Sequence, residues 1–226
     1  MMDHKKAHWN SQQKLLRGII LKADQLEQAL KLCLEQHAMV HTAEMSGIKT
    51  VTFEDQLWEG LDQITFRSKT NKKGRTIAYG LWHSTRIEDI TLNLLVANDK
   101  QVINRANWLE RINSSIYDTG NAMTASEIIE FSQGINMEEL RNYRITVGRK
   151  TREIIQKLDN SALKRKVAAE SLQLVLEQGA VLNVEGAKWL IDYWSKRNIA
   201  GILLGPATRH HLVHLNESFS AKNSRK

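Results

Sequence analysis

Residues 209–217 read Arg-His-His-Leu-Val-His-Leu-Asn-Glu and place three of the chain's eight histidines within five positions. Pro206 favours the start of a helix just before this stretch, because a proline in the first helical turn gives up no hydrogen bond. On that helix His210 and His214 lie about one turn apart on one face, so their imidazoles can point at a common metal ion. His211, three residues before His214, is an alternative partner to His210. The alternative without a metal is a histidine-rich helix face in contact with solvent.

The composition predicts one all-α domain that spans residues 1–226. This length suffices for a single substantial core, and one proline, twelve glycines and many Leu, Ala, Glu, Gln, Lys and Arg residues favour helices over strands. Apolar residues recur at the three-to-four spacing of buried helix faces. We expect long helices near residues 9–43, 76–97, 124–157 and 206–221, with shorter accessory helices between them.

A further histidine is predicted to face the interior from the second of these helices. His83 shares its face with Ile87 and Leu94, which follow it by four and eleven residues. A lone histidine in that position is most often a hydrogen-bonded core residue. Opposite a helix that carries His210 and His214 it becomes the natural third ligand. Three histidines with open coordination positions are typical of a catalytic metal rather than a closed structural one.

The first predicted helix carries two more histidines on or beside its apolar stripe, His37 and His41. Two interpretations stay open for them. They are buried histidines hydrogen-bonded to a neighbouring helix, or they add a ligand or a proton-transfer group to the metal site. Cys33 on the same stripe is most simply a small buried apolar residue, and as the only cysteine it excludes an intramolecular disulfide.

The charge of the chain is basic, with a formal net charge of +7 and a pI near 9.5. Two stretches concentrate it, residues 67–75 and 141–152, and such runs are more often solvated surfaces than binding sites. We do not expect nucleic-acid binding, because no recognised reading motif accompanies the charge. The polar start of the chain and the lack of a long apolar run predict a soluble, cytoplasmic protein with no membrane segment.

Two motifs resemble a known family. Residues 82–89, Trp-His-x-x-Arg-Ile-Glu-Asp, followed by His210-x-x-x-His214, resemble the DinB-like superfamily of bacterial four-helix-bundle metalloproteins, and the likeness extends over most of the chain. The resemblance implies a four-helix bundle with additional short helices. It also implies that His83, His210 and His214 bind one divalent metal ion, and that the activity is thiol S-transfer or metal-dependent hydrolysis.

The chain also departs from the family pattern. Members often continue the last histidine with Arg-Gly-Gln, whereas residues 215–217 here are Leu-Asn-Glu. The loss of that arginine removes an anion-binding group, and Glu217 adds a carboxylate. Members often form homodimers, and we expect Trp58, Trp108 and Trp189 to be exposed for that purpose.

The expected reaction divides according to the nucleophile that the metal activates. The ligand type allows zinc, nickel, iron or manganese. For a low-molecular-weight thiol that carries carboxylates, Arg86 and Arg209 lie within about a turn of proposed ligands and are expected to bind substrate. For hydrolysis, Glu217 or His41 is expected to accept a proton or to orient a ligand. We favour thiol transfer; a non-catalytic helical protein that binds nucleic acid or another acidic partner is the rival.

Overall fold

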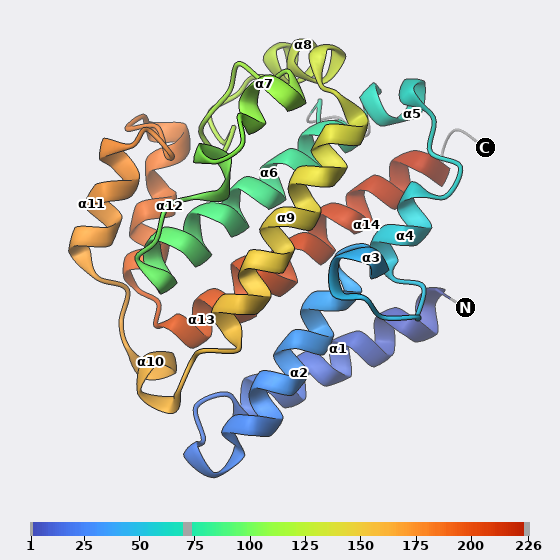
Figure 1. Cartoon of the computed structure of the whole chain (residues 1–226). Helices are drawn as coiled ribbons and strands as arrows, with labels where there is room; N and C mark the ends of the chain where they lie inside the picture. The colour runs from blue at the N-terminus through green and yellow to red at the C-terminus, as the bar shows by residue number, and fades with distance from the viewer. Residues whose placement is uncertain (1, 70–73, 224–226) are drawn as a thin grey trace.

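The computed structural model describes residues 2–69 and 74–223, and within these residues the protein is all-α. The described residues form no sheet; they contain isolated bridges between Lys69 and Thr76 and between Lys166 and Asn198. Part of the first basic stretch, residues 70–73, lies outside the described residues. The helices are α1 (Met2–Ile19), α2 (Leu26–Met39), α3 (Ala43–Ser46), α4 (Phe53–Trp58), α5 (Gln63–Arg67), α6 (Ile77–Ile90), α7 (Trp108–Ile112), α8 (Ala125–Gly134), α9 (Met137–Ile155), α10 (Asn160–Lys164), α11 (Ala169–Glu177), α12 (Glu185–Ser195), α13 (Ile199–Leu204) and α14 (His210–Asn223) (Figure 1). Short 3-10 helices cover Ala23–Gln25 and Val102–Asn104, and π-helical turns cover Thr91–Ala97 and Gly205–Arg209.

The prediction of one continuous helix over residues 9–43 is wrong. The chain reverses between Ile19 and Leu26, so α1 and α2 pack against each other as a helical hairpin (Figure 1). The turn is closed by the Lys22 amide, which donates to the carbonyl of Ile19 at 2.8 Å. Residues 20–25 contain no glycine or proline. The usual breaker signals are therefore missing, which explains why the apolar spacing alone predicted an unbroken helix.

The other three long helices are confirmed in position, each with an added irregularity. The helix expected at 76–97 is α6 followed by a π-helical turn. The helix expected at 124–157 is divided into α8 and α9, because the side chain of Asn136 accepts hydrogen bonds from the amides of Glu138 and Glu139 and starts a new helix. The helix expected at 206–221 begins as the π-helical turn and continues as α14.

Helix α6 lies at the centre of the fold, packed against α14 on one side and α9 on another (Figure 1). All 14 of its residues are buried, including polar ones such as Arg86 and Glu88. The apolar core divides into two clusters along this helix, one that includes Trp82 near its start and one that includes Ile90 at its end. Buried polar residues are concentrated between the two clusters. Burial of a charged group is costly unless the group is paired. The helices that face this part of α6 therefore have to supply partners for its charged side chains.

The tryptophans expected at a dimer surface are placed differently. Trp108 is only 4% exposed and packs beneath the guanidinium of Arg111, so the expectation of its exposure is wrong. Trp58 is partly buried and donates to Glu54, whereas Trp189 is 51% exposed. The homodimer stays a prediction, which light scattering can test. None of the helices in the described ranges combines the length and the apolar character that a membrane span requires.

Candidate metal centre

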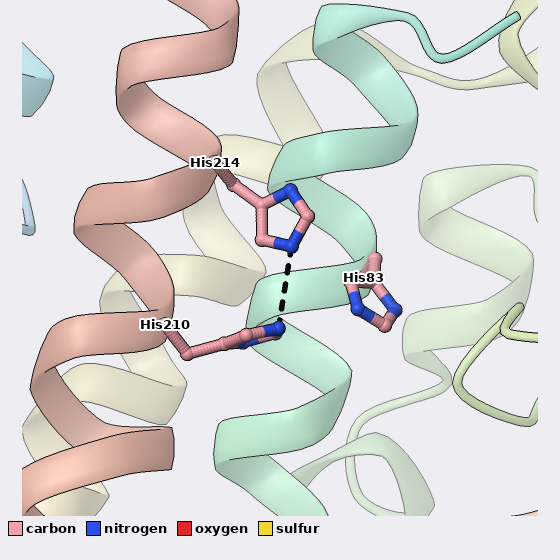
Figure 2. A group of neighbouring side chains, drawn as sticks. All are labelled: His83, His210 and His214. Carbon is pink, nitrogen blue, oxygen red and sulfur yellow. Dashed lines mark hydrogen bonds between the residues drawn. The ribbon is translucent and has the colours of Figure 1, made fainter. Parts of the chain in front are cut away.

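Three histidines from two helices meet beside the surface of the protein. His83 extends from α6, and His210 and His214 extend from the first two turns of α14 (Figure 2). Each offers a ring nitrogen, and these donor atoms all lie within 4.8 Å of one another. The ring centroids are 4.7–5.0 Å apart. His83 and His214 are buried and His210 is partly exposed, so the group is open to solvent on one side only.

The start of α14 is positioned by a contact with the first helix. Gln13 on α1 donates from its amide nitrogen to the Leu204 carbonyl and to the Thr208 hydroxyl, both at 3.0 Å. The Thr208 hydroxyl in turn donates to a carbonyl one turn earlier in the chain. These bonds connect the π-helical turn to α1. The turn is thereby fixed immediately before His210, the first residue of α14.

The distances within the group suit a single metal ion. The Nε2 atoms of His210 and His214 are 3.2 Å apart. Two nitrogens bonded to one tetrahedral ion at about 2.1 Å are separated by about 3.4 Å, so this pair is already close to a ligand geometry. The dashed contact in Figure 2 joins these two nitrogens, and His83 faces them from the opposite helix.

The tautomers of two of the three histidines follow from their partners. His83 Nδ1 lies 2.7 Å from the carbonyl oxygen of Thr119, which only accepts, so His83 donates from Nδ1. His214 Nδ1 lies 3.1 Å from a carboxylate oxygen of Glu217 and donates there. In both residues the lone pair is therefore left on Nε2, the nitrogen that faces the centre of the group. Such hydrogen bonds from the far side of the ring are typical of metal-bound histidines.

Glu217 and Arg75 form a charged pair at the edge of the site. Arg75 donates from Nη1 to both carboxylate oxygens of Glu217, at 3.0 and 3.2 Å. The hydrogen bond from His214, together with its charge and that of Arg75, lowers the pKa of Glu217 to about 2 against the opposing effect of burial. Of the two roles expected for Glu217, this geometry supports the orienting one. A carboxylate with so low a pKa is a weak proton acceptor.

Burial keeps the His83 and His210 imidazoles neutral, as metal binding requires. Burial, followed by the charge of His214, lowers the pKa of His83 to about 3. The pKa of His210 lies well below its usual range for the same first reason, with His214 and His83 adding to it. Tyr79 stacks on the His83 ring at a centroid distance of 5.5 Å and holds that ring from the side. The group thus includes two neutral imidazoles, His83 and His210, that can act as nitrogen donors in a largely buried site.

The two arginines expected to bind substrate do not lie in the positions predicted for them. Arg86 is fully buried and donates to Asp89, Tyr143, Gln101 and the Tyr117 carbonyl, so the expectation that it reaches the mouth of the site is wrong. It is held inside because α6 is covered on every face. Arg209 is exposed, but it turns toward α1 and donates to Asn10 at 2.6 Å. The arginine beside the histidines is Arg75.

Sequence reasoning missed Arg75 and Thr119 as supporting groups of this site. Arg75 precedes the N-cap of α6, and only its basic charge within the loop marks it in the sequence. Thr119 contributes a backbone carbonyl, which no sequence pattern reveals. Its own amide donates to the carbonyl of Ala180 at 3.2 Å, and this bond fixes the loop against the rest of the fold. His41 lies elsewhere, in a separate buried group with His37.

No protein-family model matches the sequence, and no curated protein matches it. The geometry of the site therefore has to support any functional assignment by itself.

Proposed function

We propose that this protein is a divalent-metal-dependent enzyme whose ion is bound by His83, His210 and His214. The observation that carries the proposal is the convergence of three imidazoles from two helices. Thr119 and Glu217 support it, because they orient the rings with the Nε2 lone pairs inward. His210 is the partly exposed member of the group, so an open coordination position on its side would be the one that water or substrate reaches, as in catalytic sites.

We extend the proposal to the fold family. A DinB-like bundle would be formed by the hairpin of α1 and α2 together with α6, α9 and α14. The remaining helices would be additions to it. The placement of one proposed ligand on α6 and two, four residues apart, on α14 supports this assignment. Zinc, nickel, iron and manganese all suit such a ligand set.

Within the enzyme class we favour transfer of a low-molecular-weight thiol over hydrolysis. A divalent ion at the site would lower the pKa of a coordinated thiol enough to yield the thiolate without a protein base. Hydrolysis gains more from a base, and neither predicted base suits that task. Glu217 is engaged by both Arg75 and His214, and His41 lies in another group.

Arg75 is the residue that we assign to the acidic part of the thiol. Its side chain is 29% exposed beside the open edge of the histidine group, so its guanidinium can meet a carboxylate from solvent. In the transfer itself the thiolate sulfur forms a bond to an electrophilic carbon of the second substrate. The leaving group departs from that carbon with the bonding electron pair, and the thiol proton passes to solvent.

The test combines metal analysis with a screen of reactions. Protein purified without a metal-affinity tag is analysed for bound metal and incubated with bacillithiol, mycothiol or glutathione and a set of electrophiles, alongside ester and amide substrates. We expect metal-dependent consumption of at least one thiol, lost in His83→Ala and retained in His8→Ala, which changes an exposed histidine of α1.

Three outcomes would count against this assignment in different ways. Equal metal content in His83→Ala, His214→Ala and the parent would refute the ligand set. Hydrolysis without thiol consumption would refute the choice of reaction. No turnover that depends on metal would favour the non-catalytic rival, and steep loss of nucleic-acid binding with added salt would identify its partner.

A further inference from the structure

A second group of histidines lies in the interior, apart from the proposed site. His37 is on α2 and His41 lies two residues beyond the end of that helix, while Glu88 is on α6 and His211 is on α14. All four residues are fully buried, each with a relative exposure of 0%. The side chains of three helices that are distant in the sequence therefore meet at one buried carboxylate.

The three imidazoles approach that carboxylate with the same ring atom. The Nε2 atom of His37 lies 2.7 Å from Glu88 Oε1, and the Nε2 atoms of His41 and His211 lie 3.0 and 2.9 Å from Glu88 Oε2. The rings are also close to one another, with centroids of 4.5 Å for His37 and His41 and 4.8 Å for His41 and His211. For His37, His41 and Glu88 the donor atoms all lie within 4.8 Å of one another.

Hydrogen bonding does not account for this arrangement. His37 and Glu88 form a hydrogen bond, whereas among the described residues no aligned hydrogen bond reaches His41 Nε2, His211 Nε2 or Glu88 Oε2, although each of the two nitrogens lies within 3.0 Å of that oxygen. The ring nitrogens are close to the oxygen without the alignment that a bond requires. Several buried polar atoms therefore lack an aligned protein partner among the described residues, which is costly in a folded protein.

Among the described residues, no lysine or arginine is paired with the Glu88 carboxylate, whose ion-pair partners are the three histidines. The buried guanidinium near the group belongs to Arg144, and it forms a two-point pair with Glu54 at 2.9 and 2.8 Å. The rest of its donors are used by the Leu81 carbonyl and by the hydroxyls of Ser84 and Thr85. A buried carboxylate surrounded by imidazoles, with the neighbouring arginine committed elsewhere, is an environment that a bound cation would complete.

We propose that His37, His41, His211 and Glu88 bind a second divalent transition-metal ion, separate from the ion at the first site. Three imidazole nitrogens and one carboxylate oxygen form a four-ligand set of the kind that zinc accepts in closed structural sites. Ligands of a tetrahedral ion with bonds of about 2.1 Å are about 3.4 Å apart, so the Glu88 carboxylate, whose oxygens are 2.7–3.0 Å from the ring nitrogens, has to withdraw from the rings by about half an ångström to admit the ion. Because all four positions would come from protein and none is exposed, this ion is structural, and it joins α2 to α6 and α14.

The test counts metal ions with the two groups removed in turn. The full chain is unfolded with chelator, refolded with excess zinc, desalted, and analysed for zinc per chain; refolding in the presence of zinc allows the buried site to load. We expect two ions in the parent and in His8→Ala. We expect one in His83→Ala/His214→Ala, which keeps the buried group, and one in Glu88→Gln/His211→Gln, which keeps the first site.

His83→Ala/His214→Ala leaves the buried group unchanged, so it tests the proposal even if Glu88→Gln/His211→Gln fails to fold. X-ray absorption of zinc in His83→Ala/His214→Ala should give four nitrogen or oxygen neighbours at about 2.0–2.1 Å, and zinc should raise its melting temperature. One ion in the parent and none in this variant would overturn the inference and leave the proposed function standing, because the buried group would then be a proton-sharing network. One ion in the parent and one in this variant would support the inference and refute the first site.

Discussion

Replacement of Glu217 by glutamine tests whether the carboxylate beside His214 supports metal binding at the first site. Glutamine keeps the shape of the side chain and retains an oxygen that can accept from His214 Nδ1. It removes the negative charge and presents an amide group to Arg75. In the unchanged protein, Arg75 makes two contacts with the carboxylate. The variant therefore changes the electrostatic support of the ligand with little change in packing.

The expected magnitude follows from the exposure of the pair. Loss of an orienting partner of a metal-bound histidine typically costs 10- to 100-fold in affinity. Glu217 is 33% exposed and Arg75 is 29% exposed, so solvent screens part of the effect. We expect zinc affinity at the first site to fall by about tenfold in Glu217→Gln, which corresponds to about 1.4 kcal/mol.

The assay is a competitive zinc titration against a chromophoric chelator at fixed pH and ionic strength, in the Glu88→Gln/His211→Gln background so that only the first site is counted. Glu130→Gln is the matched control, because it removes the same charge from an exposed position on α8. Urea unfolding of each metal-free variant shows whether the fold is equally stable. If Glu217→Gln binds zinc within twofold of Glu130→Gln, the orienting role is refuted.

Three further predictions concern stability and reactivity. Arg144→Met should lower the free energy of unfolding, measured with urea, by about 3–5 kcal/mol, because it leaves Glu54 buried without its partner. The further change Glu54→Gln should recover at least half of the lost stability, and no recovery would contradict the pairing. Cys33 should resist alkylation in the native protein at neutral pH and react after unfolding, because burial raises its pKa to about 12; rapid native labelling would show that the site opens. Gly148→Ala should lower the melting temperature at a cost of about 1–2 kcal/mol, because its Cβ would lie 2.7 Å from the Cγ atom of buried Met45; an unchanged melting temperature would show that Met45 can move aside.

The helical class and the proposed ligand set could be read from the sequence because both depend on local spacing. His210 and His214 are four apart, and His83 follows the apolar period of its helix, so the faces of the helices determine where these side chains point. The structure places the three rings together. The break between α8 and α9 follows Gly134, a residue type that disfavours the interior of a helix, but the apolar spacing continued across it.

The features that the sequence did not predict depend on contacts between distant segments. Arg86 carries a charge and a long side chain, and local rules favour an exposed position for it. Its burial depends on partners such as Gln101 and Tyr143, which come from other parts of the chain. The turn after α1 likewise has no glycine or proline to mark it, and Trp108 is buried by packing that its neighbours in sequence do not reveal.

The adjacent histidines of α14 show how one pair of helices can serve two separate groups. Successive residues of an α-helix point about 100° apart, so His210 and His211 cannot both face one ion. On α6, His83 and Glu88 are five residues apart, which corresponds to about 7.5 Å along the axis and a rotation of about 140°. The first group therefore lies on the side of the α6–α14 pair that reaches solvent, and the second lies on the side that α2 covers with His37. Because His210 and His211 share one stretch of backbone, any ligand that fixes His211 also limits rotation of α14 about its axis, and so holds His210 in the direction that the first site requires.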